Sequence, residues 1–76
     1  MAHDYIVEVN DAAGLFTEFG ADDWPSCLRV VRDLARRYPQ KHVSAYNAAQ
    51  MDVDTDGLTD DQRDEMIVAV DEGRGR

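Results

Sequence analysis

The sequence predicts one small α+β domain with the element order ββαβα. Residues 4–10 alternate in polarity as a strand does, and residues 23–38 repeat apolar side chains at helical spacing. The length of 76 residues is enough for a single domain. We therefore expect one domain over residues 1–76, ordered from about residue 4 to residue 72. A three-stranded antiparallel sheet should be covered on one face by the first helix, with a second helix at the C-terminus.

A β-hairpin is predicted at the N-terminus. The stretch "DAAG" at 11–14 separates two apolar runs, and Asp followed three residues later by Gly is typical of a type I turn with a bulge. This loop sets a register in which Val7 faces Phe19 and Glu8 faces Glu18. One face of the hairpin then carries Tyr5, Val7, Val9, Leu15 and Phe19. The reverse face carries Ile6, Glu8, Phe16 and Glu18, and we expect it either to be solvated or to bind a partner.

The first helix is predicted over residues 23–38. Asp22 or Asp23 is expected to cap its start, and Pro39 ends it. Its apolar stripe consists of Trp24, Cys27, Leu28, Val31, Leu34, Ala35 and Tyr38. Residues 41–51 fit either a strand or a helix. A strand over about 41–48 is favoured, because a hairpin covered by a helix usually needs a third strand.

The second helix is predicted over residues 60–72. Thr59 and Gln62 have the spacing of a capping box, and acids in the first turn complement the helix dipole. Met66, Ile67 and Val70 are predicted to form its apolar stripe, and Gly73 to end it.

The chain is strongly acidic, with 16 Asp and Glu against 8 Lys and Arg and a formal charge of −8. This charge opposes direct binding to nucleic acid and to anionic membranes, and it favours a basic protein surface or a cation. No apolar run approaches the ~20 residues of a membrane helix, and the N-terminus lacks the pattern of a signal peptide. We expect a cytoplasmic protein. Adaptation to high salt would also explain the acidity, without any partner.

The stretch "DVDTDGLTDDQRDE" at 52–65 resembles the first half of an EF-hand calcium loop. Carboxylates at alternate positions followed by Gly57 match that loop, but its twelfth position, which should be a bidentate Glu, is Arg63. The resemblance implies a Ca²⁺ site, and the alternative is a turn that leads into a helix cap. The ligands implied by the resemblance are Asp52, Asp54, Asp56, the Leu58 carbonyl and Asp60.

No catalytic residue is predicted. Cys27 and His42 are the only candidate nucleophile–base pair, and nothing in the sequence brings them together. The five glycines are too scattered for a phosphate-binding loop. We expect neither an enzyme nor a bound cofactor, apart from Ca²⁺ in the alternative above.

The favoured function is a non-catalytic module that binds a basic protein surface. In size, charge and topology the chain is similar in type to accessory proteins of phages and mobile elements, including anti-CRISPR inhibitors, although no motif carries this likeness. The likeness implies a nucleic-acid mimic that inhibits or regulates a host protein. An alternative is a structural subunit that pairs its outer sheet face with a second copy. The predicted partner-binding residues are Asp52, Asp54, Asp56, Asp60, Asp61, Asp64, Glu8, Glu18 and Phe16, with Phe16, Tyr46 and Trp24 as candidate apolar anchors.

Overall fold

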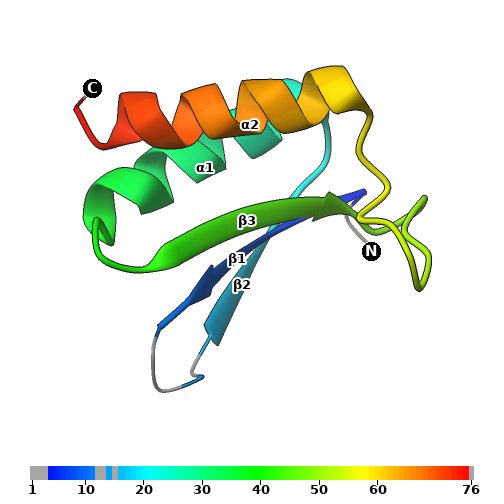
Figure 1. The fold of residues 1–76 in the computed structure, drawn as a ribbon, viewed down its shortest axis with the longest axis horizontal. Helices are drawn as coiled ribbons and strands as arrows, with labels where there is room; N and C mark the ends of the chain where they lie inside the picture. Colours follow the sequence, from blue (N-terminus) through cyan, green and yellow to red (C-terminus); the bar gives the residue numbers. More distant parts are fainter. Residues whose placement is uncertain (1–3, 12–13, 15, 76) are drawn as a thin grey trace.

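A computed structural model describes residues 4–11, 14 and 16–75 and confirms the predicted α+β fold. The strands form one antiparallel sheet in the order β2-β1-β3. Both helices lie on the same face of this sheet, side by side, and the opposite face is open (Figure 1). The elements are β1 (Tyr5–Asn10), β2 (Phe16–Ala21), α1 (Trp24–Arg37), β3 (His42–Asn47) and α2 (Asp60–Gly73).

The N-terminal hairpin has the predicted register. Val7 is paired with Phe19, and Glu8 is paired with Glu18. The Gly14 amide donates to the Asp11 carbonyl at 3.1 Å, and Gly14 has a φ of 84°, which glycine adopts without strain. The prediction for Leu15 falls outside the described residues.

The core lies between the sheet and α1, as the apolar stripe predicts. Asp23 caps α1 by accepting the Ser26 amide at 2.8 Å. Trp24 is only partly buried, and its ring packs against Tyr5 with centroids 5.4 Å apart. The buried apolar residues of this core are Val7, Val9, Ala21, Cys27, Val31, Leu34, Val43, Ala45 and Ala69.

The ambiguous segment after α1 forms the third strand. β3 pairs with β1 and places Val43 opposite Val9 and Ala45 opposite Val7. This pairing buries both β3 side chains in the core. In a strand these side chains share one face, so the third-strand prediction is confirmed.

The predicted apolar stripe of α2 is wrong at Ile67, which is 57% exposed. Ala69 is fully buried instead, and Gly73 lies against α1. A Cβ added at Gly73 would stand 2.3 Å from the Arg32 carbonyl oxygen, so the two helices approach too closely for any side chain there. Gly73 is therefore a packing residue inside the helix rather than its stop, and Arg74 forms the C-cap.

Across residues 4–11, 14 and 16–75, no helix has both the length and the apolar character needed to cross a membrane.

Candidate functional site

The acidic stretch begins in a compact loop at 48–57 between β3 and α2. The Asn47 amide donates to the Asp56 carbonyl at 2.8 Å, so the two ends of the loop meet. Gly57 closes this neck with a φ of 77°, and a Cβ there would stand 2.8 Å from the Asn47 carbonyl oxygen. Such a closed excursion from the fold is typical of an Ω-loop. Its tip is fully accessible, with Val53 94% exposed.

Arg63 binds the base of this loop from the first turn of α2. Its guanidinium lies 3.2 Å from the Asp56 carboxylate and 2.8 Å from that of Asp60. Asp56 also accepts the Leu58 amide at 3.0 Å. Burial would raise the pKa of Asp56, but the Leu58 amide and the Arg63 guanidinium outweigh it and hold the pKa below its ordinary value. The same contact with Asp56 raises the pKa of Arg63.

This geometry gives the calcium prediction no support. Arg63 already engages two of the implied ligands, Asp56 and Asp60. Asp52 turns back and accepts the Val53 amide at 2.7 Å. Within the described part of the chain, no three His, Cys, Asp or Glu side chains gather as a metal ion requires. The capping box at Thr59 and Gln62 is confirmed, so the stretch is a turn that leads into a capped helix.

Four further acids of the stretch are exposed. Asp52 and Asp54 lie at the loop tip, and Asp61 and Asp64 lie on the first two turns of α2, all exposed. No ion pair with a described residue is formed by Asp54, Asp61, Asp64 or Asp71. Residues 52–72 hold nine Asp and Glu and one Arg, so most of the net charge of the protein is concentrated in this one segment.

A patch of exposed apolar side chains interrupts the acids on α2. Ile67 is 57% exposed and Val68 is 54% exposed, and both lie on the helix between Asp64 and Asp71. We call this surface the outer face of α2. It consists of Asp60, Asp61, Asp64, Ile67, Val68 and Asp71.

Each apolar residue of the outer face also borders a surface hollow. Ile67 lines one together with Val43 and Val70, and Val68 lines another together with Leu28. The sequence pattern does not predict this surface, because it places Ile67 on the buried stripe of the helix. Ile67 and Val68 are adjacent in the sequence, and one narrow stripe of a helix cannot bury both, so their adjacency indicates an exposed apolar residue.

Two predicted partner-binding residues lie on the other side of the molecule. Glu8 and Glu18 are directly opposite each other on the open face of the sheet, which the helices do not cover (Figure 1). The Tyr46 hydroxyl lies 3.5 Å from the Glu18 carboxylate. Burial raises the pKa of Tyr46, and the charges of Glu18 and Glu8 raise it further. The predicted acidic residues thus form two separate surfaces rather than one.

The candidate aromatic anchors have different positions. Trp24 donates its indole N–H to Glu65 at 2.9 Å and packs on Tyr5, so it joins α1 to α2. Tyr46 lies on the open sheet face, half-buried. Phe16 belongs to β2 opposite Asn10, and its side chain falls outside what the structure describes.

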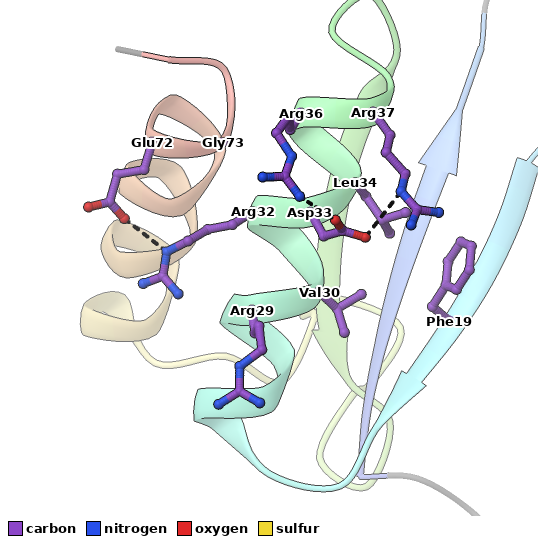
Figure 2. A pocket seen from close by; sticks show the side chains of 10 residues that line it. All are labelled: Phe19, Arg29, Val30, Arg32, Asp33, Leu34, Arg36, Arg37, Glu72 and Gly73. Carbon is purple, nitrogen blue, oxygen red and sulfur yellow. Dashed lines mark hydrogen bonds and ion pairs between the residues drawn. The ribbon is translucent and has the colours of Figure 1, made fainter.

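The arginines of α1 line a hollow that also includes Phe19 of β2 and Glu72 and Gly73 of α2. Figure 2 shows Asp33 near the middle of this hollow, with Arg36 and Arg37 directed to it at 2.9 and 3.3 Å. Arg32 reaches Glu72 on α2 at 3.0 Å. Most of the basic charge of α1 is therefore paired within the protein.

Comparison of the chain with protein-family models, with curated proteins and with solved structures finds no match.

Proposed function

We propose that this protein is a non-catalytic binding module that docks the outer face of α2 onto a basic surface of a larger protein. The observation that carries the proposal is the exposed pair Ile67 and Val68 among the exposed aspartates of the outer face of α2. Protein interfaces commonly place a few apolar anchors at the centre and polar groups at the rim. The acids of the outer face favour Lys and Arg on the partner, and the basic residues Lys41 and Arg74 line only the hollow beside Ile67.

The two kinds of residue have different roles in this proposal. Asp61, Asp64 and Asp71 steer the encounter, because the attraction between opposite charges acts over a longer distance than apolar contact. Ile67 and Val68 supply affinity by leaving water, each contributing about 1 kcal/mol or more when fully covered. The neighbouring hollows give side chains of the partner a place beside each anchor.

A nucleic-acid-handling protein is the partner class that we favour. Such proteins carry basic surfaces that bind phosphate groups. An acidic helix and loop would compete for such a surface, so inhibition of nucleic-acid binding is the proposed consequence. The exposed acids Asp52 and Asp54 lie at the tip of the loop that leads into α2.

Affinity capture from an extract of the source cells tests the proposal. Immobilised wild type should retain a basic protein that is lost with Ile67→Asp/Val68→Asp and with Asp61→Lys/Asp64→Lys. The matched control is Glu8→Gln/Glu18→Gln, which changes the open sheet face and should retain the protein. Retention of the same proteins by all four forms would contradict the proposal.

A further inference from the structure

The strand β2 leaves one edge of the sheet without a partner. In the order β2-β1-β3 it is an outer strand, and Thr17, Glu18, Phe19 and Gly20 are all exposed. The other outer strand, β3, contacts α2, and the Asn47 amide at its outer edge donates to the Asp56 carbonyl. Natural proteins usually shield open edges with Lys, Pro or a covering element. β2 has no Lys or Pro, and no described element lies along its outer edge.

The register shows which backbone groups of β2 are free. Just before β1, the Asp4 carbonyl accepts the Ala48 amide at the end of β3. The backbone N–H and C=O groups of the even-numbered residues of β1 therefore point toward β3. Antiparallel ladders alternate, so the odd-numbered residues of β1 bond toward β2. Val7 pairs with Phe19, so the odd-numbered residues of β2 bond back to β1. The N–H and C=O groups of Glu18 and Gly20 therefore point outward.

A hollow lies beside this edge on the helix side of the sheet. Phe19 on β2 faces Val30 and Arg37 of α1 across it (Figure 2). Arg37 is paired with Asp33 at 3.3 Å, so its charge is already balanced. A strand added to β2 would direct alternate side chains into this hollow, against Phe19 and Val30. The part of the hollow next to β2, where Phe19 and Val30 lie, therefore favours apolar side chains, whereas charged residues such as Arg29, Arg36 and Glu72 line the rest of it.

The open face of the sheet has the opposite preference. Glu18 is directly opposite Glu8, and like charges in such pairs are destabilising. No described residue pairs with Glu18 as a cation. The outward side chains of an added strand would lie next to Glu18, so Lys or Arg at those positions would relieve the repulsion.

A second copy of the chain would bind the β2 edge poorly, because it would place further acids next to Glu18. Two antiparallel β2 strands related by a two-fold axis would bring two Glu18 side chains directly opposite or diagonal to each other. Both molecules would also carry a charge of −8. An extended segment of another protein with basic residues next to Glu18 avoids both the contact between two glutamates and the repulsion between two acidic molecules.

We propose that the β2 edge binds an extended segment of another protein by strand addition, and that this segment alternates apolar and basic residues. Main-chain bonds to Glu18 and Gly20 supply affinity, and the two faces supply specificity. This surface is separate from the outer face of α2, so the inference goes beyond the proposed function and either can fail alone.

Amide NMR of the full chain with a blocked octapeptide of alternating Val and Arg tests the inference. We expect shifts and slowed hydrogen exchange at the Glu18 and Gly20 amides. A matched octapeptide of alternating Val and Glu should not bind. A Val–Arg octapeptide that is N-methylated at alternate residues keeps one edge of free amides and should still bind. The same peptide N-methylated at every residue should not bind the wild type.

The variant Glu18→Arg tests the charge preference. This variant should bind the Val–Arg peptide up to about tenfold more weakly than the wild type does, and it should bind the Val–Glu peptide in preference. The inference is overturned if the shifts map only to the outer face of α2, if N-methylation at every residue leaves the affinity unchanged, or if Glu18→Arg keeps the original preference. A dimer of the wild type in light scattering that protects the same two amides would also overturn it, because the occupant would then be a second copy.

Discussion

Asp56 is an acid of the stretch 52–65 with a structural role. Its carboxylate accepts the Leu58 amide and binds Arg63, so it joins the loop to the start of α2. Leu58 is buried, and its packing depends on the position of this neck. Asp56 is therefore a structural residue, unlike Asp61 and Asp64, which have no partner among the described residues.

Replacement of Asp56 should lower stability in a pH-dependent way. Asp56→Ala leaves the Leu58 amide without its acceptor, so the free energy of unfolding should fall by about 1 kcal/mol at neutral pH. The folded-state pKa lies below the ordinary value of 3.8, so the contribution of the charge is complete above that value. It is lost as the pH falls through the folded-state pKa. The stabilities of wild type and Asp56→Asn, measured by urea unfolding, should converge as the pH falls below 3.8 and through the folded-state pKa of Asp56.

Gly73 is required by helix packing, and its replacement should show this. Gly73→Ala should destabilise the protein by about 1–3 kcal/mol, because the new methyl group meets the Arg32 carbonyl. Helix propensity alone predicts the opposite, a gain of about 1 kcal/mol. Thermal unfolding distinguishes the two. Gly75→Ala measures backbone strain without a steric clash, because Gly75 has a φ of 80° and no atom lies within 4 Å of its added Cβ.

The hairpin of β1 and β2 contains a pair of like charges on neighbouring strands. Glu8 and Glu18 face each other, and the nearby Tyr46 hydroxyl has a raised pKa. Glu18→Gln should raise the free energy of unfolding by about 0.2–1 kcal/mol and lower the pKa of Tyr46. The wild type should lose stability as the pH rises above 10.0 through the folded-state pKa of Tyr46. An NMR titration of Tyr46 measures the shift, and an unchanged pKa in Glu18→Gln would contradict the role of Glu18.

The elements with local signals could be predicted from the sequence. "DAAG" specifies a turn and hence the register, and the α1 stripe repeats without interruption. Thr59 and Gln62 specify the start of α2 because the capping box involves only neighbouring residues.

The packing of α2 could not be predicted in the same way. The close approach of α1 and α2 requires small residues, so Ala69 and Gly73 face inward while Ile67 faces outward. A hydrophobic pattern gives most weight to large side chains and therefore selects the wrong face. The division of the acids between two surfaces also depends on tertiary structure, because Glu8 belongs to β1 and Asp61 to α2, and the sheet and the helices form separate layers.

At the scale of the whole molecule, charge is distributed unevenly. The arginines of α1 are largely paired internally, whereas the segment 52–72 is left with a large excess of acid. Screening by salt should therefore relieve repulsion mainly around α2.

Thermal unfolding in KCl, MgCl₂ and CaCl₂ at matched ionic strength separates screening from metal binding. We expect a higher midpoint with added salt and the same midpoint in all three salts, because Arg63 engages Asp56 and Asp60. A ligand at 100 times its dissociation constant would add about 2.7 kcal/mol, which is easily detected. A shift specific to CaCl₂ would restore the calcium loop.

Site-specific photo-crosslinking tests the proposed binding surface most directly. A photoreactive phenylalanine analogue replaces Val68 on the outer face of α2 in one form and Ser44 on the open sheet face in another. In an extract of the source cells, the form labelled at 68 should crosslink to a basic protein, and high salt should suppress the product. The form labelled at 44 should not yield this product. Equal crosslinking from both positions, or none from 68, would contradict the assignment of the outer face of α2 as the docking surface.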